Sequence, residues 1–131
     1  MADLKEKGIS LLSSTVVAMG EDNTKANLYT VPVGKECTVR FVVVRNLSDS
    51  VACSADNDFG IGDPAAGWKD TVDLSAVDAR NDYYVVTGPT DNARIEAVFV
   101  AGDVFGIQTD IGGTSSPVDG TIDVFGYIFD A

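Results

Sequence analysis

The chain has 131 residues, no histidine and a formal net charge of −11, from nine basic and twenty acidic residues. This length fits a single domain, and the scattered basic residues form no patch that would bind nucleic acid directly. No apolar run is long enough to cross a bilayer, so no membrane contact is expected. Without histidine, a Ser-His-Asp triad is impossible and the commonest zinc ligand is missing.

Strand-forming residues alternate with turn signals along most of the chain, which favours an all-β fold. Residues 1–9 form a charged arm, and residues 10–131 are predicted to form one domain. We predict an antiparallel β-sandwich or jelly roll of about eight or nine strands. The predicted strands are, in chain order, Leu11–Ala18, Ala26–Val31, Cys37–Arg45, Val51–Ala55, Thr71–Leu74, Tyr83–Thr87, Arg94–Val100, Val104–Thr109 and Thr121–Phe129.

Strict alternation along the third predicted strand places its side chains on two opposite faces. One face is wholly apolar and is expected to point into the core, through Cys37, Val39, Phe41 and Val43. The other face ends in Val42 and Val44, which we expect on an outer surface that meets another subunit. The expected core comprises Val39, Phe41, Val43, Ile95, Ala97 and Phe99.

The last predicted strand is apolar on both faces. One face carries Ile122, Val124, Gly126 and Ile128, and the other carries Phe125, Tyr127 and Phe129. A strand in a small sandwich contributes one face to its own core, so the second apolar face needs a different partner. We therefore predict a subunit interface at Phe125, Tyr127 and Phe129, together with Val42 and Val44 of the third strand.

The two cysteines are expected to be free, buried thiols. A hairpin turn at Asn46–Ser50 would place Cys53 opposite Val43. Cys37 would then lie six residues further along the strand, about 20 Å away at the strand rise, whereas a disulfide needs Cα atoms within about 7 Å. Free thiols also fit assembly in a reducing cytoplasm.

No catalytic, cofactor or metal site is predicted, but three weaker interpretations stay open. The segment Asp56–Trp68 reads as a long loop whose Asp56–Asp63 part is rich enough in oxygen ligands for calcium, although a solvated turn is favoured. Trp68, Tyr83 and Tyr84 together suggest a sugar-stacking platform, so the alternative function is a carbohydrate-binding module. A glycosidase using a carboxylate pair is the third class.

Two stretches carry a resemblance to known families. "YTVPVGKECTVRFVVVRNLSDSV", over residues 29–51, resembles a strand-turn-strand segment of tailed-phage virion proteins. "GDVFGIQTD" and "TIDVFGYIFD", within residues 102–130, are similar to the end of trimeric jelly rolls of the complement and tumour-necrosis-factor kind. In those proteins a Gly-Asp pair opens the penultimate strand, and an aromatic-Gly-aromatic pattern, here Phe125 to Tyr127, marks the last.

The resemblance implies a non-enzymatic phage structural protein, located in the virion and assembled in the host cytoplasm. The implied roles are a capsid decoration (cement) protein, a head fibre or another accessory protein. The implied partners are further copies of the chain in a homotrimer, and the major capsid protein or another virion protein. The lack of a catalytic set, the small all-β domain and the surplus apolar strand face agree with this interpretation.

Overall fold

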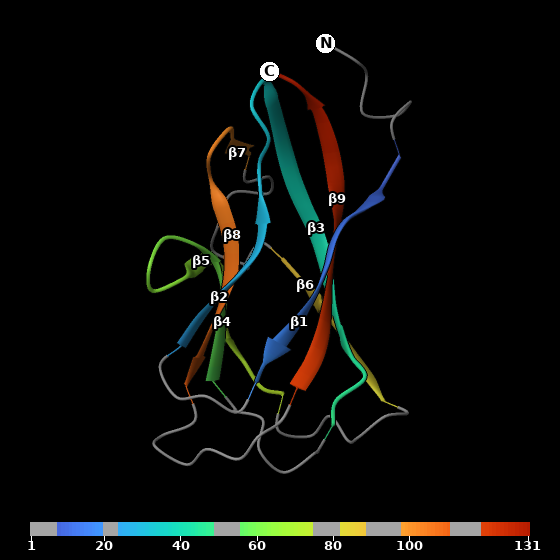
Figure 1. Cartoon of the computed structure of the whole chain (residues 1–131), viewed down its shortest axis with the longest axis vertical. Helices are drawn as coiled ribbons and strands as arrows, with labels where there is room; N and C mark the ends of the chain where they lie inside the picture. The colour runs from blue at the N-terminus through green and yellow to red at the C-terminus, as the bar shows by residue number, and fades with distance from the viewer. Residues whose placement is uncertain (1–7, 20–23, 49–55, 75–81, 89–97, 111–118) are drawn as a thin grey trace.

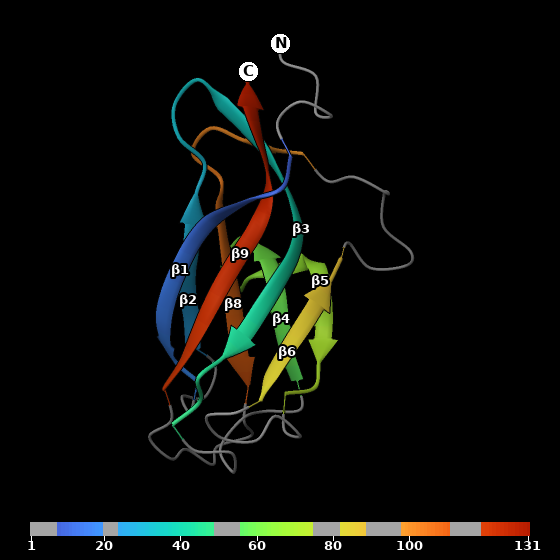
Figure 2. The same cartoon turned by 90° about the vertical axis from the view of Figure 1, so that its right-hand side faces the viewer.

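A computed structural model describes residues 8–19, 24–48, 56–74, 82–88, 98–110 and 119–131. Within these ranges the chain forms nine strands and no helix, and the strands build two antiparallel sheets packed face to face (Figures 1 and 2). None of the described residues forms a helix that could span a membrane. The strands are β1 (Ser10–Ala18), β2 (Thr24–Thr30), β3 (Lys35–Arg45), β4 (Asp56–Ile61), β5 (Ala66–Val72), β6 (Tyr83–Thr87), β7 (Phe99–Val100), β8 (Val104–Asp110) and β9 (Asp119–Asp130).

The strand order is that of a jelly roll, which confirms the predicted fold class. Sheet A has the order β1-β9-β3-β6, with the short strand β7 also paired to β3, and sheet B has the order β2-β8-β4-β5. The pairs β1/β9, β2/β8, β3/β6 and β4/β5 are nested, so the chain follows one folded ribbon that wraps around the core. Figure 2 shows sheet A in front of sheet B, with β6 and β5 at the same side of the sandwich.

The core lies between the two sheets and combines aliphatic side chains with a cluster of aromatic rings. Val42, Val44 and Ile122 of sheet A are fully buried, as are Phe59, Trp68, Phe105 and Ile107 of sheet B. The rings of Trp68 and Phe105 meet edge to face, with 5.3 Å between their centroids. Alternate residues of each strand therefore supply the core, as expected when one face of a sheet is buried.

A β-bulge in β3 reverses the facing that strict alternation predicts. Val39 pairs with Gly126 of β9, but the next pair is Phe41 with Phe125, so Arg40 is an extra residue in β3. An extra residue exchanges the two faces of everything beyond it. The prediction that Val42 and Val44 lie on an outer face is therefore wrong, because both are fully buried in the core.

The same bulge turns Phe41 and Val43 outward, so their predicted place in the core is also wrong. Val39 and Phe99 are buried as expected, whereas Ile95 and Ala97 lie outside the described residues. Gly126 makes the bulge possible, because a Cβ atom there would lie 2.0 Å from the carbonyl oxygen of Thr38. The β3 backbone approaches β9 so closely at this point that only glycine fits.

The predicted partner of β3 in the hairpin is wrong as well. Along Phe41–Arg45, β3 pairs with β9 on one side and with β6 on the other. Val43 thus pairs with Asp123 and Val85, and no place remains for Cys53, which lies outside the described residues. Cys37 is fully buried and carries a free thiol.

The expected loop Asp56–Trp68 is a hairpin of β4 and β5 instead. Asn57 is buried and its side-chain amide donates to the carbonyl of Val72 at 3.0 Å, while the Asp58 carboxylate accepts from the amide of Thr71 at 2.8 Å. These side chains therefore hold the irregular partner strand in place. Asn57 and Asp58, which are typical turn residues in the sequence, instead connect the two strands through side-chain hydrogen bonds.

Trp68 is a core residue and not a surface platform. Its side chain is 1% exposed, and its indole N–H donates to the carbonyl of Val39 at 3.1 Å. A buried tryptophan needs such an acceptor, and this hydrogen bond ties sheet B to the bulged region of β3. The sugar-stacking interpretation loses its central residue, although Tyr83 remains largely exposed.

Because Trp68 fills the core and bonds across the sheets, replacing it should cost much more stability than replacing an exposed apolar residue. We expect Trp68→Ala to lower the free energy of unfolding by about 3–5 kcal/mol. Val33→Ala is the control, because Val33 is 95% exposed and its loss should change stability by less than about 0.5 kcal/mol. Urea denaturation followed by circular dichroism measures both, and equal effects would contradict a packed role for Trp68.

Candidate interaction surface

The outer face of sheet A, which points away from sheet B, carries a band of apolar side chains. Leu11, Phe125, Phe41 and Thr87 lie in one row across β1, β9, β3 and β6. The rings of Phe41 and Phe125 stack with 4.7 Å between centroids and 18° between planes. Cross-strand aromatic pairs of this kind stabilise a sheet even on its solvent side.

Two further rows extend this band toward one end of the sheet. Val43 of β3 lies beside Val85 of β6, and the next row ends in Val16 on β1 and Tyr83 on β6. Val16 and Tyr83 are each 70% exposed. Large apolar groups at both margins of one sheet face are unusual for a surface that meets only water.

The three residues of β9 predicted at an interface, Phe125, Tyr127 and Phe129, lie on this outer face, but their side chains are exposed to different extents. Phe125 and Tyr127 are half-buried, and the guanidinium of Arg40 lies 6.0 Å from the Tyr127 ring centroid. Phe129 is only 8% exposed, so the chain itself already covers this ring. The available aromatic surface is therefore centred on Phe125 and Tyr127.

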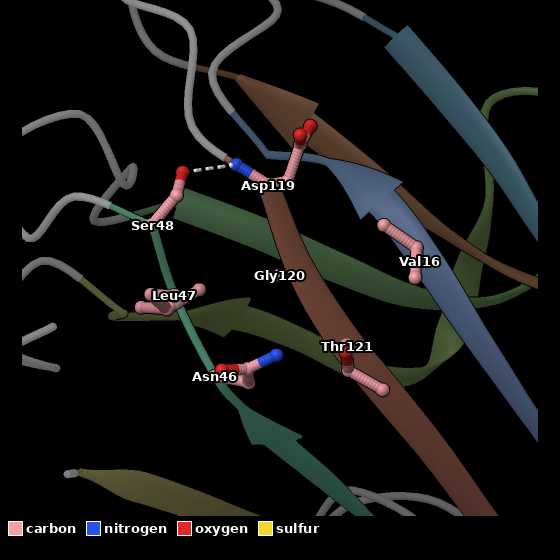
Figure 3. Close-up of a pocket in the computed structure, with 7 residues that line it drawn as sticks. All are labelled: Val16, Asn46, Leu47, Ser48, Asp119, Gly120 and Thr121. Atoms are coloured by element: carbon pink, nitrogen blue, oxygen red, sulfur yellow. Dashed lines mark hydrogen bonds between the residues drawn. The ribbon is translucent and has the colours of Figure 1, made fainter. Parts of the chain in front are cut away.

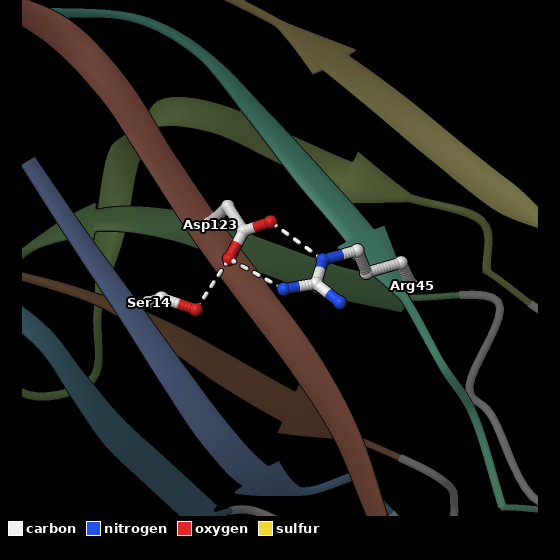
Figure 4. A network of polar contacts seen from close by, with 3 residues as sticks. All are labelled: Ser14, Arg45 and Asp123. Carbon is white, nitrogen blue, oxygen red and sulfur yellow. Dashed lines mark hydrogen bonds and ion pairs between the residues drawn. The ribbon is translucent and has the colours of Figure 1, made fainter. Parts of the chain in front are cut away.

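A polar network of three strands interrupts the apolar band (Figure 4). The Asp123 carboxylate of β9 accepts from Arg45 Nε of β3 at 2.7 Å and from Ser14 Oγ of β1 at 2.6 Å. Arg45 Nη2 lies 3.5 Å from the second carboxylate oxygen. The network therefore connects three neighbouring strands of sheet A, namely β1 at the edge of the sheet, then β9 and β3.

The pKa of Asp123 reflects two opposing effects. Burial raises it, but the hydrogen bonds from Arg45 and Ser14 and the positive charge of Arg45 together bring it below its ordinary value. The same contacts raise the pKa of Arg45. Asp123 is thus held as a carboxylate that is almost fully buried on the outer face.

A shallow cleft of about 290 Å³ lies where β1, the end of β3 and the start of β9 meet (Figure 3). The amide of Asp119 donates to Ser48 Oγ at 2.8 Å, which closes one wall of the cleft. Asp119 is the one ionisable side chain among its described lining residues, so they offer no acid–base pair. The lining residues are Val16, Asn46, Leu47, Ser48, Asp119, Gly120 and Thr121.

The described residues contain no group of three carboxylate or thiol side chains that could hold a metal ion. Asp56 and Asp58 lie on β4, and the Asp58 carboxylate accepts from the β5 backbone, so this candidate for calcium is used within the hairpin. Burial, and secondarily the charge of Asp103, raises the pKa of Cys37 to about 11. This thiol stays protonated near neutral pH and is a poor nucleophile.

Sequence reasoning missed most of the outer face. The alternation pattern predicts Phe41 and Val43 in the core, and nothing in the sequence marks Leu11, Val16 and Val85 as surface residues. The continuous apolar run Phe41–Val44 in β3 is the available signal, because a strand segment that is apolar on both faces is ambiguous in its facing. The side that each residue takes depends on the bulge at Arg40, which leaves no clear mark in the sequence.

The Asp123 network should make stability depend on pH. Because the folded-state pKa of Asp123 is depressed, its contribution is fully present above the unfolded pKa and is lost as pH falls through the folded value. We expect Asp123→Asn to lower the free energy of unfolding by about 1–2 kcal/mol at pH 7, because charge-assisted hydrogen bonds are lost. The difference between the variant and the parent should shrink below about pH 4.

Asp130→Asn serves as the matched control, because Asp130 is exposed and pairs with Lys35 on the surface of the same sheet. Exposed pairs contribute about 0–1 kcal/mol, so this variant should show a small effect. Urea denaturation across pH 3 to 7 provides the measurement. A constant difference between Asp123→Asn and the parent over that whole range would rule out the network as its source.

No protein-family model matches the chain, and no curated protein matches it in sequence. Solved structures with a similar fold do exist. One is a chain of the cyanophage Pam1 capsid asymmetric unit, with 16% identity and a TM-score of 0.55, covering 92% of this chain and 83% of that chain. Another belongs to the acidic stable capsid structure of Helicobacter pylori bacteriophage KHP30, with 16% identity and a TM-score of 0.57, covering 94% of this chain and 92% of that chain. These likenesses establish a shared fold.

Proposed function

We propose that the chain is a non-enzymatic virion structural protein that binds the surface of a phage capsid as a decoration (cement) or head-fibre accessory protein. The observation that carries this proposal is the fold shared with chains of two phage capsids. Its partners are further copies of itself and the major capsid protein. Its location is the virion, and it assembles in the host cytoplasm.

The extent of the two matches supports an accessory role. The matches cover 92% and 94% of this chain and 83% and 92% of the capsid chains, so the capsid chains are themselves small proteins of similar length. The likeness therefore concerns the whole sandwich and not a shared part of a larger protein. A small sandwich of this kind is the size expected of a protein that attaches to a shell.

The chemistry of the described residues supports a binding role over catalysis. The cleft offers one carboxylate, the Cys37 thiol is buried with a raised pKa, and Trp68 lies in the core. The conspicuous surface feature is the apolar outer face of sheet A. Such a face favours contact with another protein.

Self-association through this face is the second part of the proposal. We place Phe125 and Tyr127 at a homotrimer interface, with Phe41 and Leu11 beside them on the neighbouring strands. An aromatic ring buries about 150–250 Å², so a few rings per subunit contribute several kcal/mol at about 25 cal/mol per Å². Cyclic symmetry repeats each contact around one axis, which multiplies the effect of a single substitution.

Phe125→Asp tests the interface. The variant would place one carboxylate per subunit in the buried contact, so we expect it to dissociate the oligomer while the subunit stays folded. Sedimentation velocity at tens of micromolar measures the oligomeric state, and circular dichroism checks the fold. Val33→Asp is the control, because it adds the same charge to a side chain that is 95% exposed in the turn before β3. A wild-type monomer at this concentration would contradict self-association in solution.

The virion assignment has its own test. Mass spectrometry of purified particles from the phage that encodes the chain should detect it in a regular copy number relative to the shell protein. Removing its gene should leave intact shells that lose stability to heat or to low salt. Absence of the chain from purified virions would disprove the assignment, whatever its oligomeric state in solution.

A further inference from the structure

The strands at the ends of the two sheets, β1, β6, β2 and β5, are not protected in the same way. Three of them contain bulges, which disrupt the regular backbone edge that another strand could pair with. Leu12 is the extra residue near the start of β1, beyond which Ser13–Ala18 pair with β9 without a shift, and Leu28 is the extra residue in β2. In β5 the register shifts twice, and Thr71 there has a positive φ of 57°.

The fourth edge, β6, has none of these protections apart from its short length. It pairs with β3 over five consecutive residues without a register shift, from Thr87 opposite Phe41 to Tyr83 opposite Arg45. Its sequence, YYVVT, contains no charge, proline or glycine. Tyr83, Tyr84 and Val85 are 70%, 40% and 46% exposed. No further strand pairs with β6 among the described residues, so within this part of the chain its far edge is regular, apolar and unpaired.

We propose that the open edge of β6 accepts an extended segment of the capsid shell protein by strand addition, and that lysine or arginine residues flank this segment. The inference rests on the proposed decoration function and names the contact that would carry it. Main-chain hydrogen bonds to β6 would supply the binding, and alternate side chains would supply the specificity. Sheet A would thereby gain one strand next to β6.

Charge decides between a shell segment and a second copy of the chain. Pairing two copies through β6 would bring the acidic residues around this edge of one copy next to those of the other. The exposed carboxylate of Asp82 directly precedes β6. Asp70 and Asp73 are exposed on and just after β5, the strand of sheet B that lies beside β6 in Figure 2. These acidic residues around β6 favour a partner segment with basic residues at its ends.

The side chains of β6 define the pattern of the incoming strand. Val85 and Tyr83 lie on the outer face, in the rows of Val43 and Arg45, so the new strand should place apolar side chains next to them. Tyr84 points to the opposite side and is 40% exposed at the open side of the sandwich. An apolar residue between the two outer positions of the new strand would cover this ring. The expected segment is thus apolar at successive positions, with basic ends.

Val85→Lys tests the proposal, and Val33→Lys is the control. Both substitutions place a lysine at an exposed valine, but Val85 lies on β6 whereas Val33, which is 95% exposed, lies in the turn before β3. Capsids purified from a phage that lacks the gene serve as the probe, and bound chain per shell is measured after pelleting. We expect Val85→Lys to weaken binding at least about tenfold, by repulsion of the basic ends and by loss of an apolar contact with the incoming strand, and Val33→Lys to bind like the wild type.

A second measurement on the wild type does not depend on how a variant folds. Hydrogen exchange of the amides of residues 83–87 should slow when the chain binds to capsids, and exchange at β1 should not. Equal binding of both lysine variants, with no protection at β6, would overturn strand addition while leaving decoration intact. A wild-type chain that fails to bind capsids would overturn both. Conversion of a wild-type oligomer to a monomer by Val85→Lys would assign the edge to a second copy and overturn the shell segment.

Discussion

The close approach of β3 and β9 at Gly126 is the constraint on which the rest of sheet A depends. Because glycine has no side chain, the carbonyl of Thr38 lies where a Cβ atom would be, and Arg40 becomes an extra residue in the ladder. Everything beyond that point in β3 changes face. Val42 and Val44 enter the core, and Phe41 stacks on Phe125 outside. One local contact thus decides both the packing of the core and the composition of the outer surface.

The outer face combines two features that rarely occur together on a surface exposed only to water. Apolar side chains from β1, β9, β3 and β6 share this face with polar ones, and among the polar ones is a nearly buried carboxylate, Asp123. Arg45 and Ser14 satisfy this carboxylate from the strands on either side. The network therefore keeps a charge tolerable beside apolar rows, and it fixes the register of three strands at the same time.

The edges of the sandwich show how the same fold can be closed to some partners and open to others. Bulges in β1, β2 and β5 twist the backbone and break the ladder, which discourages unspecific pairing. The edge at β6 is straight and uncharged, yet acidic residues such as Asp82 lie close to it. An edge of this kind selects a partner by main-chain pairing and by charge together, and it disfavours a second copy of the chain at this position.

Composition and local pattern determined the class of the fold and most strand positions, because β-branched and aromatic runs between turn residues permit few other structures. The same information identified β9 as apolar on both faces, and Ile122 and Val124 do lie in the core with Phe125 outside. Only the tertiary structure decided the facing of β3 beyond Val39, the partner strand beside Val43, and the burial of Trp68. Each of these depends on contacts between residues far apart in the chain, and a bulge of one residue exchanges the two faces of an apolar strand without changing its local pattern.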